Sequence, residues 1–507
     1  PERGGHHARS GGLGSFFSYN RLNRFDQANR SNRDRQTCRL MPRSPLDGPR
    51  MKFIYVALFT VMTLMSATAR AEGPPAADPG EHRPVPGWGQ LPEPESLHET
   101  GGGMGTEPDS RQGPELTLSD LERVALRNNP TLARARAAVR VAQGTWRQAG
   151  LYPNPVAGYA AEEMGDEGTA GKQGGFVGQE LVTAGKLRLN REVARQEIVR
   201  AREEVAAQQL RVLTDVQTSF YAALVAQRTI ELTNRLVKIA EEGVEAGEAL
   251  LRAQEASRVD LLQARMEANS AKVLLRNARN RRQGAWRKLA VVAGVPDMPP
   301  EPLAGEVEDI GPPLRWEQTL SQVLSESPEV AAATADVQAA QWAARRARVE
   351  WVPNVDVEAA VQHDNVGGRD VAAVRLGVPL PLFDRNQGGI SAADAQLVSA
   401  RRSVDQVHLD LRQRLAAVFR QYANARQQAE HYRGELLPDA QETLELVREG
   451  YQQGEFGYLE LLTVQRTYFQ NSLAYLDSLL QLRLSRARIE GLLLDENLTS
   501  FSESGNP

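Results

Sequence analysis

The sequence is poor in cysteine and in aromatic residues. Cys38 is the only cysteine among 507 residues, and aromatic residues make up 6% of the chain. A single cysteine provides neither a disulfide framework nor a cysteine-based metal site. The seven histidines form no His-x-x-x-His pair on a helix, and we interpret His363, His408 and His431 as surface residues rather than ligands. We therefore expect no metal site.

Catalytic motifs are also missing. No nucleophile and base pair, phosphate-binding loop or metal motif stands out in the chain. The sequence therefore predicts a protein that is not an enzyme and that carries no cofactor. The hydrophobic content of 41% and the charged content of 24% are nevertheless those of a folded protein.

Apolar runs long enough to span a bilayer are absent as well. The run Phe53–Met65 has 13 residues, whereas a membrane helix needs about 20. It follows Met51 and precedes Ala69-Arg70-Ala71, a pattern typical of a signal peptide over residues 51–71. Residues 1–50 show no periodicity, and we expect translation to begin after them. No cysteine follows the cleavage point, so no N-terminal lipid anchor is expected.

The exported part of the chain is acidic. Residues 1–71 carry 12 basic and 4 acidic side chains, so the remainder has 48 basic and 60 acidic residues and a net charge near −12. This balance argues against a nucleic-acid partner. Residues 72–113 are rich in Pro, Gly and Glu and are predicted to form a flexible linker. Residues 497–507 are predicted to be a disordered tail.

The most informative feature of the sequence is a duplication with a period of about 200 residues. Pro153-Asn154 recurs as Pro353-Asn354, and four positions recur 199 residues later. These are Ala194, Ala201, Val205 and Phe220, which become Ala393, Ala400, Val404 and Phe419. A period this long indicates two equivalent halves rather than a solenoid. We place the repeats at residues 114–304 and 305–496.

Each half is predicted to contain very long helices. The 57 residues between Gly185 and Gly243 include neither Gly nor Pro, and as a helix they would reach roughly 85 Å. A matching run extends from Ile390 to Arg433, after which Pro438 is expected to kink the helix. Apolar residues recur at spacings of three and four, which predicts packing along the helix. The fold class is therefore mainly α, with duplicated long antiparallel helical hairpins.

Short segments of alternating polarity lie between the helices. In the second half, strands are predicted at about residues 355–363 and 370–379, with valines on one face and Asp356 and Glu358 on the other. Weaker counterparts lie at about 156–163 and 172–181 in the first half. Hairpins of this kind are typical of transmembrane barrels. Four strands cannot close, and open edges are not tolerated in lipid, so several chains are expected to share one β-barrel.

The far end of each helical pair is predicted to be a tight turn. Ser257 and Asp260 form a capping box before Leu261-Leu262, and Gly457 and Glu460 occupy the same places in the second half. Two interpretations of Asp260 and Glu460 remain open. They either only cap their helices, or they also form acidic rings at the narrow end of an oligomeric tube.

These features resemble the TolC family of outer-membrane efflux ducts. The resemblance rests on the duplicated plan, on Val378-Pro379-Leu380-Pro381-Leu382-Phe383-Asp384-Arg385-Asn386-Gln387-Gly388 and on Gly454–Leu462. The Pro-Leu-Phe-Asp-Arg-Asn stretch is most similar to the CzcC-like branch, which is tied to heavy-metal efflux. The resemblance implies a homotrimer with a twelve-stranded barrel in outer-membrane lipid and a periplasmic helical tunnel, an α-barrel. It also implies a periplasmic adaptor and an inner-membrane pump of the resistance-nodulation-division class as partners.

The resemblance also assigns roles to the two turns, Ala256–Leu262 and Gly454–Leu462. It implies adaptor contacts at Ser257, Arg258, Val259, Asp260, Gly454, Phe456, Gly457 and Tyr458. It implies an entrance gate at Glu460, and the acidic-ring interpretation adds Asp260 to that gate. Where TolC has a second acid near the second turn, this chain has Thr463, which predicts a weaker gate charge.

The functional hypothesis is a passive outer-membrane exit duct. Heavy-metal cations are one cargo class that we consider, and the partner pump supplies the energy. One alternative is an exported periplasmic coiled-coil scaffold. Another is the same duct serving drug efflux or type I secretion. The sequence does not choose the cargo, because a conduit does not have to bind it tightly.

Overall fold

The computed structural model describes residues 115–165, 168, 170–254 and 257–494. The predictions for residues 1–50, the signal peptide, the linker and the C-terminal tail lie outside the described residues, as does Ala256 in the first turn.

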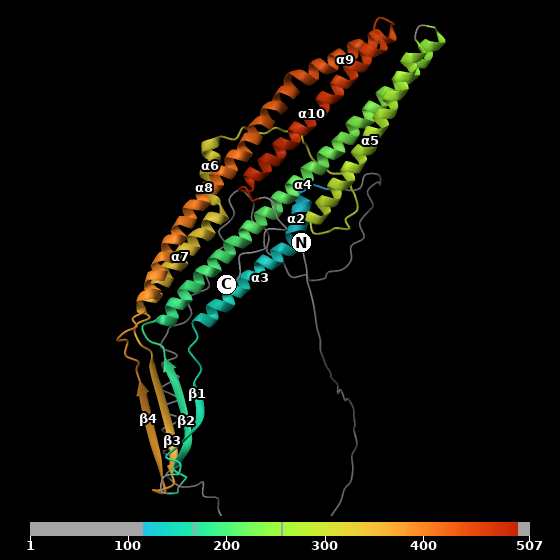
Figure 1. Cartoon of the computed structure of the whole chain (residues 1–507). Coiled ribbons are helices and arrows are strands. Elements are labelled where there is room, and N and C mark those ends of the chain that lie inside the picture. The colour runs from blue at the N-terminus through green and yellow to red at the C-terminus, as the bar shows by residue number, and fades with distance from the viewer. Residues whose placement is uncertain (1–114, 166–167, 169, 255–256, 495–507) are drawn as a thin grey trace, which may run out of the picture. The chain divides into compact units, whose positions relative to one another are not determined.

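The described chain consists of two halves with the same order of elements (Figure 1). The first half comprises α2 (Leu118–Asn128), α3 (Pro130–Ala149), β1 (Val156–Glu162), β2 (Lys172–Leu181), α4 (Lys186–Arg252) and α5 (Arg258–Val292). The second half comprises α6 (Trp316–Glu326), α7 (Pro328–Val349), β3 (Val355–Asp364), β4 (Arg369–Gly377), α8 (Gln387–His431), the π-helical turn η2 (Tyr432–Leu436), α9 (Leu437–Gln452) and α10 (Tyr458–Glu490).

Helix α4 is one continuous helix of 67 residues. The helix runs on through Gly243 and Gly247, both of them buried, and ends at Arg252. A Cβ at Gly243 would lie 3.9 Å from the Tyr458 ring, and one at Gly247 would lie 3.7 Å from Leu261. At 1.5 Å per residue the helix is about 100 Å long.

The four strands form one antiparallel sheet in the order β1-β2-β3-β4. The two hairpins lie side by side because β2 of the first half pairs with β3 of the second, with Phe176 opposite Ala360. A Cβ at Gly174 would lie 1.9 Å from the carbonyl oxygen of Val361, so only glycine fits this position of β2. Strands β1 and β4 are the edges of the sheet.

The two faces of the sheet differ in chemistry. One face carries all the charged strand residues except Asp370, and on it Arg375 donates a hydrogen bond to Glu358 at 2.9 Å. Arg375 also lies 3.9 Å from Glu162 of β1, although β1 and β4 are not paired. The other face exposes Tyr159 and Leu376. This separation is the one expected of a sheet with water on one side and lipid on the other.

The main hydrophobic core lies where α2 and α6 pack against the long helices. It includes Phe220 and Leu224 of α4, Leu415 of α8 and Leu479 of α10, all buried. Helices α3, α4, α7 and α8 lie side by side in that order between this core and the sheet (Figure 1). On the other side of the core, the hairpins α4–α5 and α9–α10 extend to the two turns.

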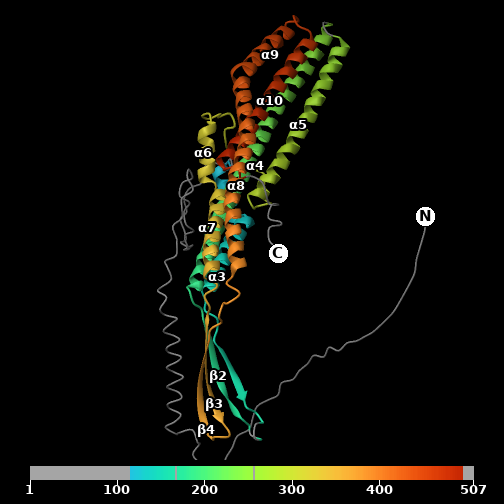
Figure 2. The same ribbon diagram turned by 60° about the vertical axis from the view of Figure 1, so that its left-hand side comes forward.

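The second half contains an irregularity that the first half lacks. The chain passes from α8 through η2 into α9, with Pro438 in the first turn of α9. Proline has no N–H to donate and clashes with the preceding turn, so a wider π-helical turn accommodates it. Figure 2 shows α9 running at an angle to α8. The predicted kink at Pro438 is therefore present.

The predicted fold class is confirmed: long antiparallel helical hairpins in duplicate and a single four-stranded sheet. None of the helices in the described ranges combines the length and the hydropathy that crossing a membrane would require.

Candidate functional site

The candidate site is the pair of turns that end the two helical hairpins. Both predicted helix starts are present. Ser257 Oγ accepts a hydrogen bond from the Asp260 N–H at 3.2 Å, and Asp260 Oδ2 accepts one from the Ser257 N–H at 3.0 Å. In the second turn, Glu460 Oε2 accepts a hydrogen bond from the Gly457 N–H at 2.7 Å. Each carboxylate therefore satisfies a backbone donor that the helix leaves free.

The second turn is held by aromatic packing. Gly454 has a φ of 79°, which glycine adopts without strain. Phe456 folds back over α9 so closely that a Cβ at Gly450 would lie 2.3 Å from its ring. The rings of Tyr451 and Tyr458 lie 6.0 Å apart. Both tyrosines are buried, so the two hairpins share a small apolar cluster near the turns.

Burial in this cluster changes the pKa values of its two tyrosines. Burial raises the pKa of the Tyr458 phenol to about 12, with a further contribution from the Glu267 carboxylate. Burial also raises the pKa of Tyr451, and the negative charge of Asp260 raises it further. The carboxylate of Asp260, on α5, therefore acts on a side chain of α9. The first turn and the second hairpin are electrostatic neighbours.

The predicted site residues differ in how they are presented. Val259 is 61% exposed and Phe456 is 41% exposed, whereas Tyr458 is 7% exposed. Ser257, Arg258, Gly454 and Gly457 lie on the exposed surface of the turns. Glu460 and Thr463 are both exposed, one helical turn apart. Asp260 and Glu460 each cap their own helix and are not joined to each other by a hydrogen bond in the described structure.

Sequence reasoning did not find the ion pairs that link the hairpins. Arg466 of α10 donates to Glu267 of α5 at 2.6 Å, and Arg448 of α9 donates to Glu242 of α4 at 2.7 Å. A signal for the first pair was available. The period that relates Ser257 to Gly457 also relates Glu267 to Thr467, the neighbour of Arg466. Glu267 and Arg466 thus occupy nearly equivalent positions in the two halves, and their opposite charges attract where the two hairpins meet.

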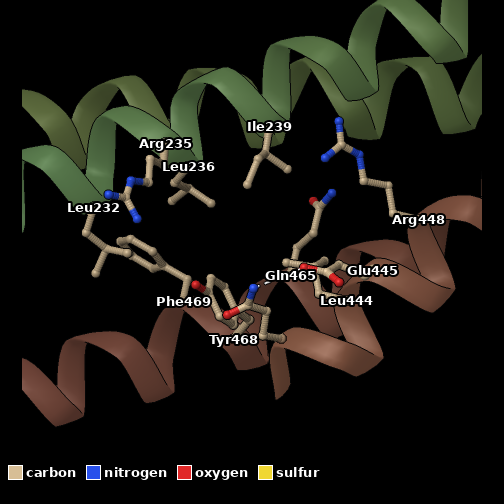
Figure 3. A pocket seen from close by; sticks show the side chains of 11 residues that line it. Leu232, Arg235, Leu236, Ile239, Leu444, Glu445, Arg448, Gln465, Tyr468 and Phe469 are labelled. Carbon is tan, nitrogen blue, oxygen red and sulfur yellow. Dashed lines mark hydrogen bonds between the residues drawn. The ribbon is translucent and has the colours of Figure 1, made fainter. Parts of the chain in front are cut away.

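A cleft lies between the hairpins next to the Arg448–Glu242 pair. Leu236 and Ile239 of α4 form one wall, and Tyr468 and Phe469 of α10 lie opposite them (Figure 3). Arg235, Glu445 and Arg448 line it as well (Figure 3). The hairpins are therefore not packed continuously along their length. Contacts near the turns hold them together beyond this opening.

This arrangement of strands at one end and paired turns at the other defines a subunit of an outer-membrane channel. The description "Outer membrane efflux protein" belongs to a family model that matches residues 121–295 and 319–493, one match for each half. The chain belongs to this family, which is a family of transport channels. It is an outer-membrane protein with a helical part in the periplasm.

Individual relatives agree with this assignment. The chain is 27% identical over 391 residues to the cobalt-zinc-cadmium resistance protein CzcC of Cupriavidus metallidurans, covering 76% of this chain and 91% of the relative. The structure of CusC matches with a TM-score of 0.62 at 18% identity, covering 76% of this chain and 98% of that one. The open-state MtrE channel of Neisseria gonorrhoeae matches with a TM-score of 0.62 at 20% identity, covering 75% and 89%.

Proposed function

We propose that the chain is the passive exit duct of a tripartite efflux system and that its cargo is heavy-metal cations such as Co²⁺, Zn²⁺ and Cd²⁺. Support for the cargo comes from CzcC, which is named for resistance to these metals and which the chain matches over 91% of its length. A second relative, 28% identical over 294 residues, is named a nickel-cobalt-cadmium resistance protein. The family assignment decides against a coiled-coil scaffold.

The observation that carries the duct is the plan shared by both halves. Each half has a strand hairpin at one end of its helices and an exposed turn at the other. Members of this family work as trimers, and three copies of four strands would give a closed wall of twelve. The long helices would then form the periplasmic tunnel. The turns would meet a periplasmic adaptor that links the duct to a resistance-nodulation-division pump.

We assign the adaptor contact to the exposed part of the two turns. Val259 and Phe456 offer apolar surface, and Ser257, Arg258, Gly454 and Gly457 surround them. Tyr458 belongs to the second turn but is buried against Tyr451. Its role is therefore to hold the shape of the turn rather than to touch the partner.

The gate follows from the same geometry. In a trimer, Asp260 and Glu460 would each supply a ring of three carboxylates at the entrance. Like charges repel when the ring narrows and attract cations to it. At the start of α10 the exposed acid is Glu460, and the uncharged Thr463 stands one helical turn further on. A single ring of carboxylates from α10 attracts cations to the entrance. Because it holds only three charges, their repulsion opposes closure of the entrance only weakly.

The test is complementation of a strain that lacks the corresponding channel gene. The intact chain should restore growth in Co²⁺, Zn²⁺ or Cd²⁺ when its adaptor and pump are present. A companion variant replaces Val259, which is 61% exposed, with Ser, and it should weaken restoration while outer-membrane levels stay normal. Restored resistance to drugs without restored resistance to metals would reject the cargo. No restoration of either kind by a correctly inserted protein would reject the duct.

A further inference from the structure

The apolar face of the sheet ends in a row of polar side chains near the hairpin turns. Asp370 of β4 lies opposite His363 of β3, and its carboxylate is 2.9 Å from His363 Nδ1. On the other side of His363 lies Gln173 of β2, which accepts a hydrogen bond from the hydroxyl of Tyr159 of β1 at 2.6 Å. The row crosses all four strands on the face that carries Leu376. It indicates the level at which acyl chains give way to headgroups on that side of the membrane.

At its other end the sheet stops before an apolar band of full height is complete. From Asp370 to Gly377, where β4 ends, the chain advances seven residues, which cover about 24 Å at about 3.4 Å per residue. At the strand tilt of about 35–45° in such barrels, this length gives a height of about 18 Å, whereas their apolar band is about 25 Å tall. A few more residues of apolar chain are therefore needed beyond Gly377.

Residues 378–383, the 378–383 segment, are suited to complete the band. The segment joins β4 to α8 (Figure 1). Within it Leu380, Leu382 and Phe383 are 75%, 66% and 91% exposed. A contiguous exposed apolar surface of this kind indicates a partner. The charged Asp384 follows directly, so the apolar stretch is sharply limited.

The backbone of the 378–383 segment fits the boundary of a lipid layer. Backbone outside a sheet or helix is costly next to lipid, because its N–H groups lack partners there. Pro379 and Pro381 have no N–H, and the Leu382 N–H donates to the carbonyl oxygen of Leu380 at 2.9 Å. Three of the six residues therefore present no unpaired N–H at the place where the sheet no longer supplies partners.

The corresponding segment of the first half makes a different kind of contact. The offset of 199 residues that carries Ala194 onto Ala393 carries Thr183 onto Leu382. Thr183 Oγ1 donates a hydrogen bond to the carbonyl oxygen of Pro353 at 2.6 Å, so the first segment is tied to the second half by a polar contact. Leucine has no hydroxyl to donate. The exposed Leu382 therefore does not repeat that contact, and an apolar surface is the better match for it.

Two exposed aromatic side chains lie at the same end of the sheet. Tyr152 and Trp351 each come four residues before a strand, β1 and β3 respectively, and are 39% and 50% exposed. Tyrosine and tryptophan are enriched where a membrane-spanning segment meets the headgroups, because the ring is apolar and its O–H or N–H reaches polar groups. Their positions favour a headgroup level at the end of the sheet where the 378–383 segment begins.

We propose that the 378–383 segment lies in the periplasmic leaflet of the outer membrane, with Leu380, Leu382 and Phe383 against acyl chains just below the headgroups. The lipid surface is the occupant because the segment directly continues the strand that carries Leu376 on its lipid-facing side. Each chain thereby contacts the membrane beyond its strands. The inference rests on the outer-membrane location of the protein and is independent of the cargo and of the adaptor contact.

Fluorescence quenching tests this location. Cys38 is replaced by Ser, Leu380→Cys is labelled with bimane, and the oligomer is reconstituted in phospholipid vesicles. Brominated acyl chains quench a label in lipid, whereas iodide quenches a label in water. The lipid control is Val374→Cys, on the lipid-facing side of β4, and the water control is Val366→Cys, in the turn between β3 and β4. These two side chains are 72% and 60% exposed.

The label at position 380 should lose as much fluorescence to brominated lipid as the label at position 374, and little to iodide. Strong quenching by iodide, as at position 366, would place the segment in water, and protection from both quenchers would mean that another copy of the chain covers it. Either result overturns the proposal. Leu382→Cys gives a second reading if the first variant does not assemble. Metal resistance is measured separately by complementation, so failure of the duct function leaves the reading of membrane contact intact.

Discussion

Arg466 of α10 donates a hydrogen bond to Glu267 of α5 at 2.6 Å and so joins the two helical hairpins close to their turns. The glutamate side chain is 13% exposed, while the arginine is 58% exposed. Glu267 is therefore largely covered between the two hairpins, whereas Arg466 lies at the surface. A second link between the hairpins joins Arg448 to Glu242, and Arg448 also lines the cleft.

Replacing Arg466 with Ala should make the entrance open more readily. An exposed ion pair contributes about 0.2–1 kcal/mol, and loss of that contribution changes an open-to-closed ratio by up to about 5-fold. Single-channel recording in planar bilayers should show that increase in open probability or in mean conductance. The control is Lys272→Ala, which removes a pair with Glu241 inside the first hairpin. An equal effect of both variants would show that the link between hairpins has no special role.

A second prediction concerns the sheet. Gly174→Ala should prevent normal pairing of β2 with β3, because the added Cβ would lie 1.9 Å from the Val361 carbonyl oxygen. We expect a loss of about 1–3 kcal/mol or more in stability and little heat-stable oligomer in the outer membrane. Gly175→Ala is the matched control, since its Cβ would lie 3.8 Å from the nearest atom, the Gly158 oxygen. The control should insert like the wild type. Normal insertion of Gly174→Ala would contradict the close approach of the two strands.

The duplication explains why so much of this fold could be predicted from the sequence. Recurring residues such as Phe220 and Phe419 revealed two halves, and the alternation around Val355 revealed strands. Both patterns can be recognised in the sequence without knowing which elements pack together. The contact between α4 at Gly243 and the ring of Tyr458 was not predictable in this way, because Tyr458 comes from a distant part of the chain.

The capping residues predicted where the two turns lie, but they did not predict which side chains pack around the turns. Ser257 with Asp260 is a signal confined to neighbouring positions, and the structure has the corresponding hydrogen bonds. Burial of Tyr458 depends on how two hairpins from different halves meet, which no local pattern encodes. The π-helical turn at Tyr432–Leu436 is similar, since Pro438 predicts an irregularity without predicting its kind.

The entrance charge gives a third prediction. Glu460→Gln should lower the preference for cations over anions, by about 2- to 5-fold for a change of about 0.5–1 kcal/mol in Coulomb energy at an exposed site. Glutamine keeps an oxygen that accepts from the Gly457 N–H, so the helix start is preserved. Thr463→Asp should change the preference in the opposite direction by adding a second acid. Reversal potentials in salt gradients measure both. If neither variant moves the reversal potential, Glu460 acts only as a helix cap.

The fourth prediction concerns alkaline pH. Burial raises the pKa of Tyr458 to about 12 in the folded state, against about 10 for a tyrosine in an unfolded chain. Below pH 10 both states carry the neutral phenol, and the pKa difference has no effect on stability. Between pH 10 and 12 the unfolded state releases this proton and the folded state retains it, so the free energy of unfolding falls by about 1–3 kcal/mol.

Tyr458→Phe should remove this part of the alkaline destabilisation, because phenylalanine has no proton to release. Urea unfolding of the detergent-solubilised protein, followed by circular dichroism at pH 8 and pH 11.5, measures the loss for each variant. The variant should lose less stability than the wild type over this interval. Tyr152→Phe, at a position 39% exposed, should lose as much as the wild type, which separates the buried phenol from the general effect of alkali. Equal losses in Tyr458→Phe and the wild type would mean that the Tyr458 phenol is not shielded from water in the folded protein.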